Sequence, residues 1–210
     1  MVILLPEIAV ATLDGRAHYK IMSILKEMGL KFDNVMPEEV LSPIIKLVIT
    51  TEKEKSLINH EKVLSLEELS KDPYLAKEEI IDNLYSNSDE SIIIGIDPGK
   101  RTGIAVYYRQ KELMGDVLNS IDETIAKVVK LIENTHAKKK IVRIGNGEPE
   151  MADKMANELS KRLRNTIIEL VDERGTSSLS KIKPSKKVVR DQRSAMIIAL
   201  RQGKRFKGSF

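Results

Sequence analysis

The chain of 210 residues contains no cysteine and no tryptophan, and aromatic residues make up only 4% of it. Without cysteine the protein can form no disulfide, no thiolate metal site and no cysteine nucleophile. This composition fits a reducing compartment, so we expect a cytoplasmic protein. No apolar run approaches the roughly 18 residues of a membrane-spanning helix, so we expect no membrane partner.

Charge of one sign is also lacking, because 35 lysines and arginines stand against 31 acids, for a net charge of +4. Net charge alone therefore gives only a weak indication of an anionic partner. The basic residues are nevertheless concentrated near the end of the chain, in "KIKPSKKVVRDQR" and "RQGKRFKGSF". Each stretch could bind a polyanion, or could simply form a solvated helix face and a tail.

A polar, turn-forming stretch, "NSDE" at residues 87–90, predicts a boundary between two domains near residue 88. Residues 1–87 read as a small α/β domain with no recognisable chemistry. Residues 88–210 alternate strand and helix patterns more regularly. Their apolar periodicity predicts strand, strand, strand, helix, strand, helix, strand and helix, in that order.

The stretch "GIDPGKRTGIAV", Gly95 to Val106, raises two interpretations of Asp97. Asp-Pro-Gly is a strong signal for a type II turn. Asp97 also ends an apolar run suited to a central strand, where α/β sheets often place their chemistry. The two interpretations are compatible, because a turn can orient a carboxylate.

Two further acids can join Asp97. Asp172 and Glu173 end a later strand pattern and alternate in direction, so only one of them can point at Asp97. Asp191 lies on the packed face of the last predicted helix. Carboxylates that converge repel one another unless a divalent cation lies between them, and oxygen ligands suit Mg²⁺ or Mn²⁺.

The order of elements over residues 91–205 resembles the RNase H-like fold. Three stretches, "GIDPGKRTGIAV", "VDERGTSS" and "RDQRSAMIIALRQG", are similar to motifs of the RuvC/YqgF branch of Holliday junction resolvases. The resemblance implies a mixed five-stranded sheet with flanking helices. It also implies a metal-dependent nuclease for structured nucleic acid, with Asp97, Glu173 and Asp191 as catalytic metal ligands.

The chain departs from the family pattern at two positions. Ser194 stands where resolvases of the RuvC type often carry a second acid on the last helix. The segment after the fourth predicted strand is "IGNGEPE", which offers Glu148 as another candidate ligand. The second metal-binding acid is therefore either Glu173 or Glu148.

Nearby cations would hold a DNA or RNA backbone. They are Lys100, Arg101, Lys181, Lys183, Lys186, Lys187, Arg190 and Arg193. Cutting a four-way junction would favour a twofold homodimer. Two alternatives on the same fold are a non-catalytic nucleic-acid-binding protein and a nucleotide-binding regulator, although only one Gly-rich loop is found where actin-like ATPases need a second phosphate loop.

Overall fold

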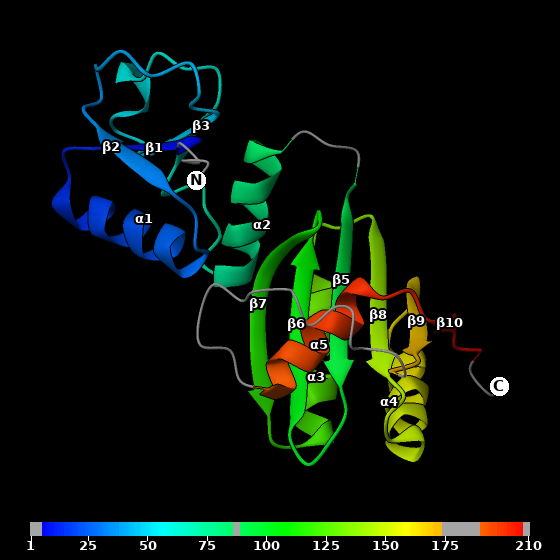
Figure 1. The fold of residues 1–210 in the computed structure, drawn as a ribbon. Helices are drawn as coiled ribbons and strands as arrows, with labels where there is room; N and C mark the ends of the chain where they lie inside the picture. Colours follow the sequence, from blue (N-terminus) through cyan, green and yellow to red (C-terminus); the bar gives the residue numbers. More distant parts are fainter. Residues whose placement is uncertain (1–5, 86–88, 174–189, 208–210) are drawn as a thin grey trace, which may run out of the picture. The chain divides into compact units, whose positions relative to one another are not determined.

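The computed structural model describes residues 6–85, 89–173 and 190–207 (Figure 1). The chain divides into two compact units, Met1–Ser86 and Asn87–Phe210. Within the described residues, no helix is both long enough and apolar enough to cross a bilayer. We describe each unit by itself.

The first unit is built on a parallel sheet of four strands in the order β2-β1-β3-β4. Its elements are β1 (Ile8–Ala11), α1 (Gly15–Glu27), β2 (Phe32–Val35), β3 (Leu47–Thr50), the 3₁₀ helix η1 (Lys55–Leu57), β4 (Val63–Ser65) and α2 (Pro73–Leu84). The α/β character predicted for this unit is confirmed. The apolar patterns did not predict β2, because "FDNV" is an edge strand whose central residues are exposed.

The second unit follows the predicted order of elements, which is confirmed. They are β5 (Ser91–Asp97), β6 (Thr102–Tyr108), β7 (Lys111–Leu118), α3 (Ile121–Asn134), β8 (Lys139–Gly145), α4 (Pro149–Arg162), β9 (Thr166–Val171), α5 (Arg190–Leu200) and β10 (Lys204–Arg205). The sheet is mixed, because β6 and β10 run antiparallel to their neighbours while β5, β8 and β9 are parallel.

The predicted strand number was wrong by one, because the sheet has six strands in the order β10-β9-β8-β5-β6-β7. The sixth, β10, has only two residues and both are exposed, so it has no apolar pattern to detect. Helix α5 covers one face of the sheet, and α3 and α4 cover the other (Figure 1). Strand β5 lies between β8 and β6, so Asp97 at its end is central in the sheet.

A row of small residues brings α5 against the sheet. Gly95, Ala105 and Gly115 are paired across β5, β6 and β7. A Cβ atom on Gly95 would lie 2.2 Å from the carbonyl oxygen of Ala195, which belongs to α5. A Cβ on Gly103 would lie 2.1 Å from the carbonyl oxygen of Asp191. The backbone of α5 therefore approaches β5 and β6 at a distance that only glycine permits.

A partly buried ion pair holds the other end of α5. The Arg143 Nε of β8 lies 2.8 Å from Glu169 Oε2 of β9, and each side chain is 12% exposed. The same arginine donates to the Ala199 carbonyl, near the C-terminus of α5, at 2.6 Å. A cation at this end of a helix satisfies a free carbonyl and complements the helix dipole. Arg143 thus joins two strands and the helix.

Two substitutions in the row of small residues, one at Gly95 and one at Gly115, should differ in their effect on stability. We expect Gly95→Ala to lower the free energy of unfolding by about 3 kcal/mol, because its methyl group collides with the backbone of α5. Gly115→Ala is the matched control, because its methyl group would meet the flexible side chain of Gln192. That side chain can turn away, so we expect a change within about 0.5 kcal/mol. Chemical denaturation measures both, and equal losses would contradict the close backbone approach.

Candidate functional site

Asp97 is the half-buried centre of the candidate site. It ends β5 and accepts a hydrogen bond from the Ser194 hydroxyl of α5. Burial, the Glu173 carboxylate and the Asp191 carboxylate raise the pKa of Asp97 to about 6, against the opposing effects of Ser194 and Arg190. The structure therefore brings together the three acids of the predicted catalytic set, from β5, from the segment after β9 and from α5.

The turn interpretation of Asp97 was wrong in its geometry. A type II turn needs a positive φ at its third residue, here Gly99. Gly99 has no such φ, and residues 98–101 form a short bend between β5 and β6. Asp97 is still the last residue of its strand and pairs with Gly103 of β6. The carboxylate is thus oriented by strand pairing and by Ser194.

The Glu173 carboxylate lies against two glycines at the end of β8, Gly145 and Gly147. Its Oε1 accepts a hydrogen bond from the Gly147 backbone N–H at 2.8 Å. A Cβ on Gly145 would lie 2.4 Å from the same oxygen, so a larger residue there would displace the carboxylate. The neighbouring Asp172 is exposed, and its carbonyl accepts from Arg201 at 3.0 Å. Of the two alternating acids, Glu173 is the one near Asp97.

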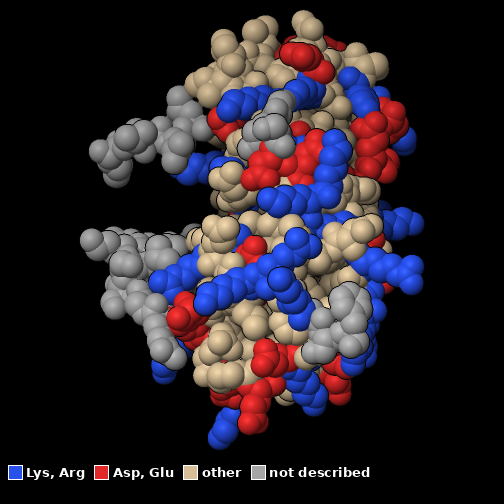
Figure 2. Space-filling model, turned by 90° about the vertical axis from the view of Figure 1, so that its right-hand side faces the viewer, with Lys and Arg blue, Asp and Glu red and all other residues tan. Residues whose placement is uncertain are grey.

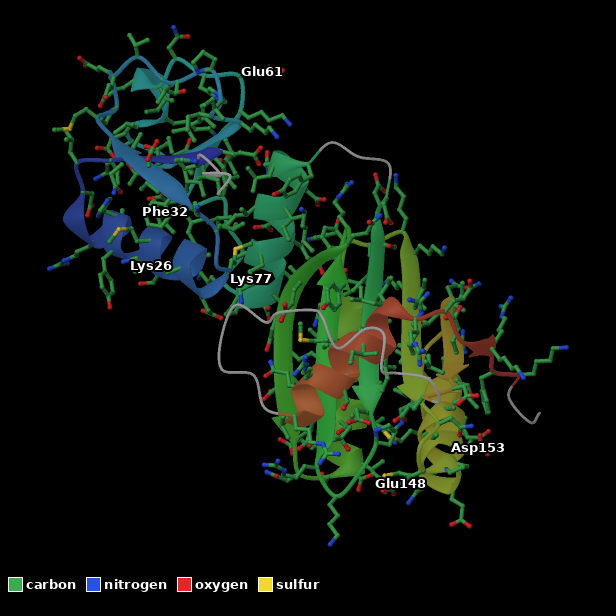
Figure 3. All side chains as sticks on the ribbon, in the orientation of Figure 1. Lys26, Phe32, Glu61, Lys77, Glu148 and Asp153 are labelled. Carbon is green, nitrogen blue, oxygen red and sulfur yellow. The ribbon has the colours of Figure 1, made fainter. Side chains whose placement is uncertain are left out.

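Glu148 is placed differently. It is exposed at the N-cap position of α4 and makes no side-chain capping hydrogen bond there. Figure 3 shows it beyond the carboxyl ends of β5 and β8. It is among the residues that line an open pocket with Met151 and Lys154. Glu173, by contrast, contributes directly to the raised pKa of Asp97.

Asp191 is engaged by a cation from the β5–β6 connection. Its Oδ2 lies 2.8 Å from a terminal guanidinium nitrogen of Arg101. The Arg101 side chain is 56% exposed, whereas that of Asp191 is 24% exposed. The pairing joins the loop that follows Asp97 to the first turn of α5.

The other predicted cations are only partly described. Lys100, Arg190 and Arg193 are exposed. Lys181, Lys183, Lys186 and Lys187 lie outside the described residues. On the face shown in Figure 2, lysines and arginines are interspersed with acids rather than gathered into an area of one sign.

The donor types suit a hard divalent cation, because three carboxylates and a hydroxyl offer only oxygen. In residues 6–85, 89–173 and 190–207, however, no three acidic or histidine side chains lie close enough together to hold a metal ion. Asp191 is paired with Arg101, and Glu173 with the Gly147 N–H. Asp191 and Glu173 are thus each engaged by another part of the chain.

Sequence comparison adds no family, since no protein-family model matches the chain and no curated protein matches it significantly. Among solved structures, the chain is similar to that of RuvC from Thermus thermophilus, with 13% sequence identity and a TM-score of 0.37. The similarity covers 51% of this chain and 90% of that chain.

The raised pKa predicts an unusual pH dependence. The folded state binds the Asp97 proton more tightly than the unfolded chain, where the carboxyl titrates near 3.8. The resulting stabilisation is complete below about pH 4 and is lost as the pH rises through about 6. We therefore expect Asp97→Asn to raise the metal-free free energy of unfolding at pH 7.5 by about 1 kcal/mol, allowing for partial exposure. The gain should shrink as the pH falls toward 4.5, as followed by denaturation at each pH.

Asp116→Asn is the control of opposite sign. Burial acts to raise the pKa of Asp116, but hydrogen bonds from Lys127 and from the Val117 N–H lower it overall. Its charge therefore stabilises the fold at neutral pH, and its removal should destabilise slightly. A loss of stability at pH 7.5 in both variants would contradict the electrostatic account of Asp97.

Proposed function

We propose that residues 88–210 form an RNase H-like domain of the RuvC/YqgF type that hydrolyses phosphodiester bonds in structured nucleic acid with divalent metal ions. The observation that supports this most directly is the convergence of Asp97, Glu173 and Asp191 from three separate elements. The order of strands and helices, and the match of these acids to the three motifs, support it as well.

In this proposal Asp97, Glu173 and Asp191 would hold Mg²⁺ or Mn²⁺. Such ions, when bound in pairs, activate water and stabilise the leaving oxygen of a phosphodiester. The protein's own residues orient the ligands, since Ser194 fixes Asp97 and the Gly147 N–H fixes Glu173. Lys100, Arg101, Arg190 and Arg193, with the lysines at 181, 183, 186 and 187, would bind the phosphate backbone. A four-way junction would be cut by a homodimer.

One observation favours a second candidate, a non-catalytic nucleic-acid-binding protein on the same fold. Ser194 offers a neutral oxygen where a resolvase often has a carboxylate, and Asp191 is neutralised by Arg101. A protein of this kind would bind nucleic acid and be indifferent to the loss of its acids. Cleavage assays therefore separate the two candidates.

The decisive experiment is a cleavage panel with Mg²⁺ and with Mn²⁺ on junction, duplex and single-stranded DNA and RNA. We expect wild type to cut at least one structured substrate. We expect Asp97→Asn to lose about a thousandfold or more in rate, because metal-ion catalysis contributes several kcal/mol. Asp116→Asn makes the same chemical change away from the site and should retain activity. Cleavage by Asp97→Asn at the wild-type rate would remove the basis of the proposal.

The two candidates for the second acid can be ranked in the same assay. We expect Glu173→Gln to lower the rate by at least about a hundredfold, because Glu173 is coupled to Asp97. Glu148→Gln should lower it less than tenfold, because Glu148 lies at the start of α4 and is exposed. Circular dichroism checks that both variants are folded. The reverse ranking would move the metal site to the end of β8.

A further inference from the structure

Arg101 lies where it could contact both the carboxylates proposed to hold metal ions and the phosphate backbone of a nucleic acid. It follows Asp97 by four residues, in the connection between β5 and β6, and more than half of its side chain is exposed. Its guanidinium neutralises Asp191, which is one of the three converging acids. An exposed guanidinium beside several carboxylates can pair with one of them or with an anion that binds from solvent.

The ion pair is weak enough to exchange. Arg101 is 56% exposed and Asp191 24% exposed, so water reaches the pair. Ion pairs at the protein surface typically contribute about 0.2–1 kcal/mol. A divalent cation at Asp191 would compete for the same carboxylate oxygens and would repel the guanidinium. A phosphodiester offers arginine an alternative partner, because its fork of donors matches two phosphate oxygens. Transfer of Arg101 from Asp191 to a phosphate thus costs little and makes a charge-assisted contact.

We propose that Arg101 couples metal binding to nucleic-acid binding. In the metal-free protein it neutralises Asp191, and a divalent ion that takes Asp191 releases Arg101 to bind a backbone phosphate. The inference rests on the proposed function, since it assigns a role to a residue of the same site.

Coupling between two binding sites is reciprocal, so metal must tighten nucleic-acid binding by the factor by which nucleic acid tightens metal binding. Couplings of this kind commonly amount to about 5- to 150-fold. Without Arg101 the free protein should bind metal more tightly, because the competitor for Asp191 is gone. The nucleic acid should then bind with the same affinity whether metal is present or absent.

The test measures binding in wild type, Arg101→Gln, Arg101→Lys and Lys100→Gln. Calorimetry gives the Mn²⁺ affinity, and fluorescence anisotropy gives the affinity for a labelled four-way DNA junction in the presence of Ca²⁺ or of EDTA. A denaturing gel after each titration checks that the DNA is intact. Lys100→Gln is the matched control, because it removes one charge from the same loop.

We expect Ca²⁺ to tighten junction binding by wild type about fivefold or more. In Arg101→Gln that factor should fall to about one, while Mn²⁺ binds about two- to fivefold more tightly than to wild type. Lys100→Gln should bind the junction more weakly but keep the wild-type factor, and Arg101→Lys should keep part of it.

Several results would overturn the inference. Arg101 takes no part in the coupling if Ca²⁺ tightens junction binding by Arg101→Gln as much as by wild type. The same conclusion follows if this variant binds Mn²⁺ more weakly than wild type. If wild type also cuts nucleic acid, the proposed function survives that result. Coupling that depends on Arg101 without any cleavage would support the exchange and reject the nuclease. A wild-type protein that binds no Mn²⁺ would overturn both.

Discussion

The candidate site depends on how closely α5 approaches the sheet. Asp191 and Ser194 belong to this helix, and both must reach the end of β5 to meet Asp97. An ordinary side chain between helix and sheet would hold the helix several ångströms further away. Gly95 and Gly103 remove that spacer, so the helix backbone itself lies on β5 and β6. Gly95 and Gly103 thus set the distance between α5 and the sheet, and with it the distance between Asp191 and Asp97.

Close approach creates an electrostatic difficulty that the local structure only partly relieves. Three carboxylates act on one another at a half-buried position, where charge is poorly solvated. Among the described residues, the Ser194 hydroxyl compensates Asp97, the Gly147 N–H compensates Glu173 and the Arg101 guanidinium compensates Asp191. Burial first, and then the Glu173 and Asp191 carboxylates, raise the pKa of Asp97 despite the hydrogen bond from Ser194. Such an arrangement favours binding of an additional positive charge.

The other end of α5 is held by an ion pair and a hydrogen bond. Arg143 and Glu169 form a pair that joins β8 to β9 and is only 12% exposed on each side, and Arg143 also binds the end of α5. Removing one partner from a pair that water reaches so little leaves a poorly solvated charge, which is costly. The C-terminal end of α5 is thus tied to β8, while its first turn carries the contact between Asp191 and Arg101.

The sequence by itself determined the element order of the second unit, because apolar periodicity and chain-order motifs are local properties. It also indicated Asp97, Glu173 and Asp191, each at the end of an apolar run or on an apolar helix face. It misjudged the Gly99 turn and gave no sign of β10. Two exposed residues leave no apolar pattern, and the same Asp-Pro-Gly letters are compatible with more than one bend.

Only the tertiary structure decided which acids converge. The sequence favoured Glu173 over Glu148 but left both open, and it did not indicate that the glycines at the end of β8 make space for a carboxylate. The pairing of Arg101 with Asp191 joins residues 90 positions apart in the chain. No local pattern specifies such a contact, because it arises from strand pairing and from the close packing of α5. The sequence determines which side chains lie along one helix or strand, whereas the distances between side chains of different elements depend on how those elements pack on the core.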